Sequence, residues 1–174
     1  MGGGARPRAR NDVSERVITV RTARESDVDA VLAIEQVSFS DPWGRDSFET
    51  ALDLERMVFL VAVASAETGA DAAEGPPELL GFVVALLLFD EAEVADLAVA
   101  PDARGRGVGG RLLDAVTVEA YAGGVRSMYL EVRESNASAR ALYDSRSFAH
   151  VGRRRGYYRN PSEDALLMRR DLVE

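Results

Sequence analysis

The chain of 174 residues has no cysteine, no lysine and a single histidine, His150. The missing cysteines exclude disulfides, thiolate metal ligands and a cysteine-bound acyl intermediate. One histidine cannot form a histidine-rich metal site, so we expect no metal. Acid–base chemistry is therefore left to aspartate, glutamate, tyrosine, serine, the backbone and water.

Positively charged residues are also fewer than negatively charged ones. The 21 cationic residues are all arginine and face 29 acidic residues, which gives a net charge of −8. Contacts with nucleic-acid phosphates require a basic surface, so a nucleic-acid partner is not expected, whereas a basic peptide end would suit the acidic balance. No apolar run approaches the roughly 20 residues of a membrane helix, and the charged start is not typical of a signal peptide. We therefore expect a cytoplasmic protein without a membrane contact.

The chain length suits one domain, and 47% hydrophobic with 29% charged residues is ordinary for a globular enzyme. Residues 1–16 lack apolar periodicity and are predicted to be a disordered tail. Residues 17–174 are predicted to form a single domain. Within it, glycine and proline between two apolar runs predict a flexible hairpin loop over residues 66–78.

Patterns typical of strands and helices alternate along this domain. Apolar runs at residues 58–64 and 79–88 predict a hairpin, and helical spacing of apolar residues starts at Val28. From residue 93 the predicted order is strand, helix, strand, helix and two final strands. This order predicts an α/β (α+β) fold with a mixed sheet of about six to seven strands flanked by about four helices.

The strongest local feature is the glycine-rich turn of residues 104–110, RGRGVGG. Its glycines allow a tight turn and bring backbone N–H groups close to a ligand. The turn opens a helix predicted over residues 108–121, whose unpaired N–H groups and dipole favour an anion. Arg104 and Arg106 add cations beside it. The turn is therefore predicted to bind a phosphate or pyrophosphate.

Two nucleotide-binding motifs compete for this turn. A P-loop requires lysine followed by serine or threonine, and the chain continues with arginine and leucine. A Rossmann fingerprint fits better, because Gly105, Gly107 and Gly110 match G-x-G-x-x-G and Glu131 lies at about the distance of a ribose-binding acid. However, five residues separate the preceding strand from Gly105, and the chain after Gly110 is too short to complete a dinucleotide domain. A glycine-rich loop without a ligand is the remaining alternative.

The motifs around this turn resemble the GNAT superfamily of acetyltransferases, and in particular its RimI-like branch of N-terminal-amine acetyltransferases. The run DLAVAP at residues 96–101, followed by the glycine turn, resembles the acetyl-CoA motif of that family. The run LEVRESN at residues 130–136, with ALY at 141–143 and Phe148, resembles the motif that follows it. Ile34-Glu35, Phe39, Pro42-Trp43 and the stretch from Tyr157 to Met168 fit the same branch. The resemblance covers about residues 17–174.

The resemblance implies a GNAT fold whose central sheet splays at an acetyl-CoA site. In this family a splayed strand exposes backbone N–H groups to the thioester, and the Val99 N–H would stabilise the oxyanion. The Asn136 side chain would bond the pantetheine arm, and it lies on the same helix face as Tyr143. The implied acetyl-CoA-binding residues are Leu97, Ala98, Val99, Arg104, Gly105, Arg106, Gly107, Val108, Gly109, Gly110 and Asn136.

Glu131 and Tyr143 are the candidate catalytic residues. Strand alternation places the Glu131 side chain on one face with Tyr129 and Arg133, and a half-buried glutamate beside a cleft can act as general base. The alternative is a structural glutamate paired with Arg133. The resemblance implies that the Tyr143 hydroxyl protonates the departing thiolate, and the alternative is a tyrosine of the core.

Four aromatic residues are candidates for binding the acceptor. By the resemblance, Tyr157 and Tyr158 would lie over the acceptor peptide, and Phe39 and Trp43 would wall its channel. The alternatives are an ordinary aromatic strand end and packing between the first helices. Glu35 is expected to be structural, with a role near the acceptor amine left open.

The chain departs from the family pattern at two places. Ser147 replaces the glycine that usually precedes the phenylalanine of the last motif, so a left-handed helix end there would cost about 1 kcal/mol. Asp96 stands where bacterial relatives often carry asparagine, which points to a difference on the substrate side.

The resemblance implies acetyl transfer from acetyl-CoA to the α-amino group of a protein N-terminus, by direct attack in a ternary complex. The acceptor would be the N-terminal alanine of a small-subunit ribosomal protein. Two alternatives stay open. One is a GNAT enzyme for a small-molecule amine, and the other is a non-catalytic acyl-CoA-binding or scaffold domain.

Overall fold

The computed structural model describes residues 17–65 and 77–172. The predicted tail and most of the predicted loop lie outside these residues, and β3 begins at Glu78, the last residue of that loop. In the described part of the chain, no helix is long and apolar enough to cross a membrane. The elements are β1 (Val17–Thr22), a 3-10 turn (Glu25–Asp27), α1 (Val28–Ser38), α2 (Arg45–Asp53), β2 (Met57–Ser65), β3 (Glu78–Leu88), β4 (Glu91–Val99), a second 3-10 turn (Pro101–Ala103), α3 (Val108–Ala122), β5 (Ser127–Arg133), α4 (Ala137–Asp144), β6 (Ala149–Tyr158) and β7 (Glu163–Asp171).

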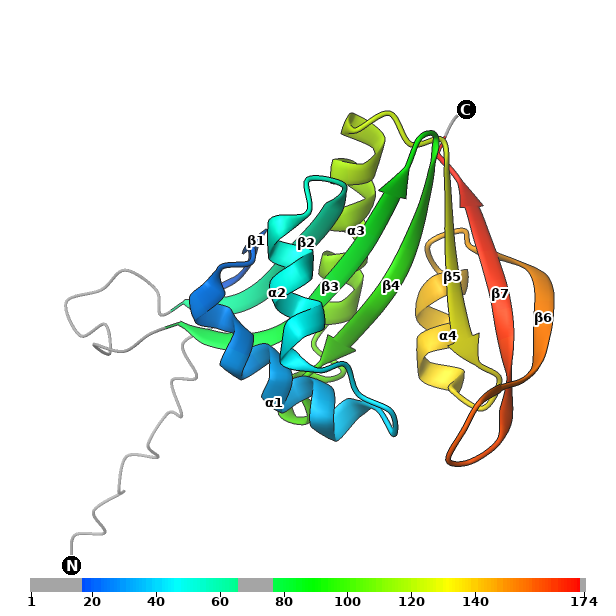
Figure 1. The fold of residues 1–174 in the computed structure, drawn as a ribbon, viewed down its shortest axis with the longest axis horizontal. Coiled ribbons are helices and arrows are strands. Elements are labelled where there is room, and N and C mark those ends of the chain that lie inside the picture. Colours follow the sequence, from blue (N-terminus) through cyan, green and yellow to red (C-terminus); the bar gives the residue numbers. More distant parts are fainter. Residues whose placement is uncertain (1–16, 66–76, 173–174) are drawn as a thin grey trace, which may run out of the picture.

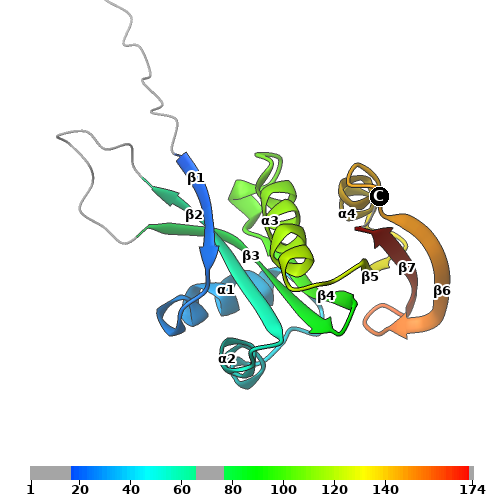
Figure 2. The same cartoon turned by 90° about the horizontal axis from the view of Figure 1, so that it is seen from above.

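All seven strands form one sheet in the order β1-β2-β3-β4-β5-β7-β6. Every neighbouring pair is antiparallel except β4 and β5, which are parallel. A parallel pair needs a crossover connection, and α3 supplies it. Helices α1 and α2 cover one face of the sheet, and α3 and α4 cover the other (Figures 1 and 2). The predicted mixed sheet and its number of strands and helices are confirmed.

The sheet splays between its two parallel strands. Only residues 91–94 of β4 pair with residues 127–130 of β5. Beyond these pairs the strands diverge, as the two neighbouring arrows in Figure 1 show. The end of β4 up to Val99 therefore has a strand neighbour on one side only, namely β3.

A β-bulge lies within β4 just before this free end. Val94 and Asp96 pair with consecutive residues of β3, Ala85 and Val84, so Ala95 is an extra residue. Directly paired residues of antiparallel strands share a face, and the extra residue therefore turns Asp96 to the face opposite Val94. This face is the one that α1 covers, because Asp96 meets Glu35 of α1 there.

The core fills both faces of the central strands. On the α1/α2 face, Phe48 of α2 and Phe82 of β3 are fully buried and meet edge to face with ring centroids 5.4 Å apart. On the other face, α3 buries a stripe at helical spacing, Val108, Leu112, Val116 and Ala120. Burial of these apolar residues fixes α3 against β2 and β3, and with it the position of the glycine turn.

Helix α4 has well-defined ends. At its start, the Asn136 Oδ1 accepts a hydrogen bond from the Ala139 N–H at 3.1 Å, which is an N-cap. After its end, Ser147 has φ +63°, and the Phe148 N–H donates to the Tyr143 carbonyl at 3.1 Å. The chain therefore has a left-handed helix end at Ser147 although the usual glycine is missing.

Candidate active site

The glycine turn adopts the backbone that its sequence predicts. Gly105 and Gly107 have φ values of +74° and +78°, in the left-handed region that favours glycine. Gly107 is the N-cap of α3, and the Arg111 N–H makes the first helical bond, to the Gly107 carbonyl at 3.1 Å. The N–H groups of residues 108–110 therefore precede the helical ladder, as in an anion-binding helix start.

Gly109 lets three elements meet at this turn. A Cβ on Gly109 would lie 3.1 Å from the Leu142 Cδ2 of α4, and 3.6 Å and 3.9 Å from side-chain atoms of Val99 and Leu97. The start of α3, the free end of β4 and α4 are thus in contact. Gly109 of the glycine turn thus meets two predicted acetyl-CoA-binding residues of β4, Leu97 and Val99, and Leu142, which was not predicted.

The free end of β4 directs backbone N–H groups into the splay. The Ala100 N–H donates to the Leu80 carbonyl of the β3 segment at 2.9 Å. Because N–H groups point to alternate sides along a strand, the Val99 N–H points away from β3, toward the gap before β5. This is the orientation that a donor to a substrate carbonyl in the splay requires.

Two polar residues of the predicted acetyl-CoA site already have partners. Arg104 donates from Nε to the Val99 carbonyl at 3.1 Å and from Nη2 to the Ser38 Oγ at 3.4 Å, so its side chain joins β4 to α1. The Asn136 oxygen caps α4, which leaves its amide N–H groups for a ligand. A cation that was not predicted, Arg146, lies against Gly110 at the start of α3 and pairs with Asp114.

Tyr143 is held in α4 with its ring 6.0 Å from that of Phe148, and it is 7% exposed. Burial raises its pKa well above the ordinary value, with smaller contributions from Tyr158 and the Asp96 charge. The hydroxyl therefore keeps its proton at neutral pH, as a general acid must. The burial fits a core tyrosine as well.

Glu131 has a largely buried side chain that pairs with Arg154, with Oε1 and Nε 2.8 Å apart. It also contacts the Tyr157 hydroxyl, and that hydrogen bond is the main reason why the Tyr157 pKa is raised. Arg133 instead pairs with Glu163, at 3.3 Å. The predicted alternative, a Glu131–Arg133 pair, is wrong, because the neighbouring strands supply closer partners to both residues.

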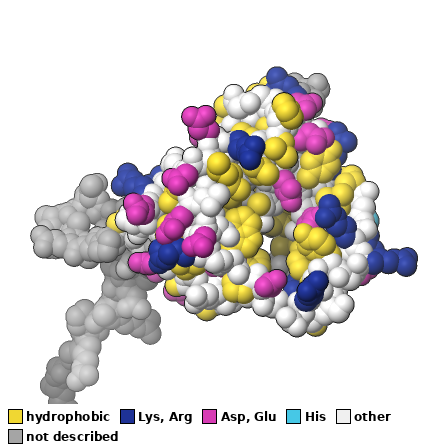
Figure 3. Space-filling view, in the orientation of Figure 1, with side chains coloured by type: hydrophobic (Ala, Val, Ile, Leu, Met, Phe, Trp, Pro, Cys, Tyr) yellow, Lys and Arg dark blue, Asp and Glu magenta, His cyan; other side chains and the backbone are white. Residues whose placement is uncertain are grey.

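Glu131 lines an open cavity of about 240 Å³ at residues of β3, β4, β5, β6 and β7, where β4 and β5 are still paired. On this face of the molecule hydrophobic side chains gather around a hollow (Figure 3). Glu91 and Glu93 of β4 line the cavity too, and with Glu131 they make it acidic. Neither was predicted, although their alternation with buried Ala92 and Val94 marks them as side chains that leave the core. The lining residues are Leu88, Glu91, Ala92, Glu93, Tyr129, Leu130, Glu131, Arg154 and Leu167.

The predicted acceptor-binding aromatics lie on two segments. In β6, the Tyr157 and Tyr158 rings meet edge to face at 5.2 Å, and burial raises the pKa of Tyr158 to about 12. After α1, the Trp43 ring packs 5.6 Å from that of Phe48, so Trp43 serves core packing, while Phe39 is 39% exposed. Only Phe39 of this second pair is free to contact a ligand extensively.

Arg133 joins these two segments and was not predicted to do so. It donates to the Ser40 Oγ at 2.9 Å, in the α1–α2 loop, and to the Arg159 and Pro161 carbonyls at 3.1 and 3.2 Å, in the β6–β7 turn. Its guanidinium also lies 4.2 Å from the centroid of the Tyr158 ring. Arg133 therefore links both walls of the predicted acceptor channel.

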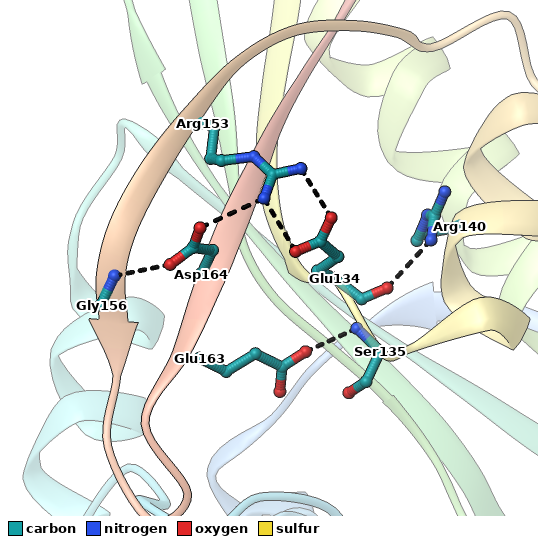
Figure 4. A network of polar contacts seen from close by, with 7 residues as sticks. All are labelled: Glu134, Ser135, Arg140, Arg153, Gly156, Glu163 and Asp164. Carbon is teal, nitrogen blue, oxygen red and sulfur yellow. Dashed lines mark hydrogen bonds and ion pairs between the residues drawn. The ribbon is translucent and has the colours of Figure 1, made fainter.

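A polar network supports the β6–β7 turn from outside (Figure 4). Arg153 pairs with Glu134 at 2.6 Å and with Asp164 at 3.2 Å, and Asp164 accepts the Gly156 N–H at 2.9 Å. The Gly156 bond is the main cause of the lowered pKa of Asp164. Single exposed ion pairs stabilise little, but this network connects β5, β6 and β7 at the point where the chain leaves the sheet.

Comparisons with known proteins agree with this architecture. The sequence pattern of the Acetyltransferase (GNAT) family matches residues 28–148. The ribosomal protein bS18-alanine N-acetyltransferases of Escherichia coli K12 and Salmonella typhimurium are 32% and 34% identical over 152 residues, which cover 86% of this chain and 95% of each relative. The crystal structure of the Escherichia coli ribosomal-protein-S18-alanine N-acetyltransferase is 30% identical, with a TM-score of 0.76 over 91% of this chain and 96% of that one. Arabidopsis thaliana NAA60 in complex with acetyl-CoA, 22% identical with a TM-score of 0.78 over 90% of this chain and 99% of that one, shares the fold.

Proposed function

Because the chain belongs to the GNAT family of acetyltransferases, we propose that it transfers the acetyl group of acetyl-CoA to the N-terminal amino group of a protein. The observation that carries this proposal is the splay between β4 and β5. There the strand pairing ends at Val94 and Leu130, Glu131 is the next residue of β5, and the Val99 N–H lies on the unpaired side of β4. In this proposal the Val99 N–H would meet the thioester, Glu131 the attacking amine, and the start of α3 the pyrophosphate.

The reaction is a direct transfer in a ternary complex. Glu131 accepts a proton from the α-ammonium group, and the resulting amine attacks the thioester carbonyl. The Val99 N–H donates to the oxygen that becomes negative in the tetrahedral intermediate. Glu131 releases this first proton to solvent, and it takes up the second proton that the nitrogen loses as the C–N bond forms. As the C–S bond breaks, Tyr143 gives its proton to the thiolate, and the second proton from the nitrogen restores Tyr143 by way of Glu131 and solvent.

Acetyl-CoA would be held by the glycine turn and the end of β4. The N–H groups of residues 105–110 would bind the pyrophosphate, and Arg106 would add positive charge. The Leu97–Val99 backbone and the free N–H groups of the Asn136 amide would bind the pantetheine arm. No described group of His, Asp or Glu residues could hold a metal ion, and this chemistry needs none.

The acceptor is the N-terminal alanine of a small-subunit ribosomal protein, bS18, in the cytoplasm. This part of the proposal rests on relatives that carry that activity in their names at 32–34% identity. The acidic cavity supports it, because Glu91, Glu93 and Glu131 would attract a positively charged peptide N-terminus. Phe39, Tyr157 and Tyr158 would contact the first residues of the peptide. We propose that residues 17–174 act as one domain in this reaction.

A peptide panel tests the function. Peptides with free N-termini, among them one that begins with alanine and basic residues, are incubated with acetyl-CoA, and acetylation is followed by mass spectrometry. Glu131→Gln and Tyr143→Phe should each lower kcat about 100-fold or more, while acetyl-CoA affinity changes less than about threefold. Normal turnover in both variants would refute the catalytic roles.

The same panel separates the two alternative functions. Small amines that react while all peptides stay unmodified would show a small-molecule acetyltransferase. Tight acetyl-CoA binding without transfer to any acceptor would show a binding or scaffold domain. Either result would refute N-terminal acetylation as the activity.

A further inference from the structure

Two acidic side chains are buried together next to the proposed site, Glu35 of α1 and Asp96 of β4. Glu35 is 1% exposed and Asp96 is 8% exposed. Their carboxyl groups lie against each other, within reach of a side-chain hydrogen bond. In residues 17–65 and 77–172, neither carboxyl forms an ion pair with an arginine. The pair has no role in the mechanism above.

Glu35 has one satisfied oxygen and one that lacks a donor. Its Oε1 accepts a hydrogen bond from the Trp43 N–H at 2.7 Å, which ties α1 to the loop before α2. Its Oε2 is buried, and no described residue donates a well-aligned hydrogen bond to it. A buried carboxylate oxygen without a donor is costly. A proton on the Asp96 carboxyl would make Asp96 the missing donor.

The groups that surround Asp96 favour this protonated form. Burial, and then the negative charge of Glu35, raise the pKa of Asp96 to about 8, against a smaller opposing effect of the Leu97 N–H. Burial also raises the pKa of Glu35, opposed by the Trp43 N–H. The third titratable group that interacts with Asp96 is Tyr143 of α4, whose pKa the negative charge of Asp96 raises. At neutral pH the two carboxyls therefore hold one proton between them.

We propose that Asp96 is a positioning residue that shares one proton with Glu35, and that the resulting O–H···O bond holds α1 and the Trp43 loop against the free end of β4. The bulge at Ala95 is what turns Asp96 toward Glu35. Three residues further along the same strand lies Val99, the proposed oxyanion donor. Loss of the shared proton would bring two negative charges into contact, push α1 from β4 and add negative charge near Tyr143.

The proposal rests on the proposed function where it concerns turnover. Asparagine has nearly the shape of a protonated aspartate and donates the same hydrogen bond at every pH. Asp96→Asn should therefore keep the contact with Glu35 and remove its titration. Asp96→Ala should lose the contact altogether. Asp53→Asn is the matched control, because Asp53 is exposed at the end of α2.

The kinetic test measures kcat and KM with an alanine-starting peptide from pH 6 to about pH 9.5. Wild-type kcat/KM should fall above about pH 8, toward a tenfold loss per pH unit, as one proton is lost. The Asn variant should keep at least about a third of the wild-type value at pH 7 and should lack this fall. The Ala variant should be at least about tenfold lower throughout. An Asn variant with the wild-type alkaline fall, or an Ala variant equal to the Asn variant, would overturn the proposal.

A stability measurement tests the pair without any turnover. The pKa of Asp96 is raised on folding, so the stabilisation by its proton is complete below about pH 4 and is lost as the pH rises to about 8. The melting temperature of Asp96→Asn relative to wild type should therefore increase from pH 5 to 8 and then level off. Glu35→Gln should show the same trend, because glutamine can donate to the Asp96 carboxylate and still accept the Trp43 N–H.

The two measurements distinguish a failure of the pair from a failure of the proposed function. If wild type acetylates peptides but the melting curves of wild type and Asp96→Asn stay parallel from pH 5 to 8, the shared proton is refuted and the function stands. If no peptide is acetylated while the melting difference grows with pH, the function fails and the carboxyl pair stands.

Discussion

Gly107→Ala offers a quantitative test of the glycine turn, residues 104–110, as an anion-binding site. Gly107 has φ +78° and ψ 8° at the N-cap of α3, and a Cβ there would meet no atom within 4 Å. The substitution therefore introduces no clash, and its whole effect is the cost of a left-handed alanine, roughly 1–2 kcal/mol. Alanine also restricts the unfolded chain, which offsets roughly 0.5–1 kcal/mol. We expect a net loss of about 0.5–1 kcal/mol in the acetyl-CoA-bound protein.

How this loss divides between folding and acetyl-CoA binding depends on the conformation of the glycine turn in the ligand-free protein. If the turn keeps its shape without a ligand, the free energy of unfolding falls by about 0.5–1 kcal/mol and acetyl-CoA affinity is unchanged. If the free turn relaxes, binding must restore the strained shape, and Kd rises by about 5- to 30-fold. In both cases the stability at saturating acetyl-CoA falls by the same amount, because the bound states are alike.

The assay combines urea unfolding, with and without saturating acetyl-CoA, and calorimetric titration of acetyl-CoA. Gly124→Ala is the matched control, since Gly124 has φ +94° and equally open surroundings in the turn between α3 and β5. It should lower stability by a similar amount and leave Kd unchanged. A Gly107→Ala protein with wild-type stability and wild-type Kd, or a Gly124→Ala protein that loses acetyl-CoA affinity, would refute the argument.

Two further substitutions test positions outside the glycine turn. Ser147→Gly should stabilise the protein by about 0.5–1 kcal/mol in urea unfolding, because Ser147 has φ +63° and glycine removes that strain at a smaller entropic cost; an unchanged or lower stability would contradict this. Arg133→Met removes the hydrogen bonds to Ser40 and to the β6–β7 turn, so KM for the peptide should rise about tenfold or more, while acetyl-CoA affinity stays the same. Steady-state kinetics and acetyl-CoA titration check this, and an unchanged peptide KM would show that the link does not order the channel.

The sequence by itself determined the features that depend on local backbone chemistry. Glycines at 105 and 107 predicted a tight turn before a helix, and both have positive φ at the start of α3. The missing glycine predicted the cost of a left-handed helix end at residue 147, and Ser147 has φ +63°. Alternation along β5 predicted that Tyr129, Glu131 and Arg133 share a face, and all three are half-buried while their neighbours are buried. Backbone geometry and side-chain period are set by nearby residues, so these features can be predicted without knowledge of the partners.

Only the tertiary structure decided which side chains meet. Glu131 pairs with Arg154 rather than Arg133 because the sheet order places β7 and then β6 beside β5. Asp96 meets Glu35 because one extra residue at Ala95 reverses the face of the strand, and a strict two-residue alternation gives the opposite side. Strand order and the position of a bulge depend on packing between segments that are far apart in the chain. The pattern of residues therefore predicted the segments proposed to bind acetyl-CoA, and the fold determined which side chains contact one another around them.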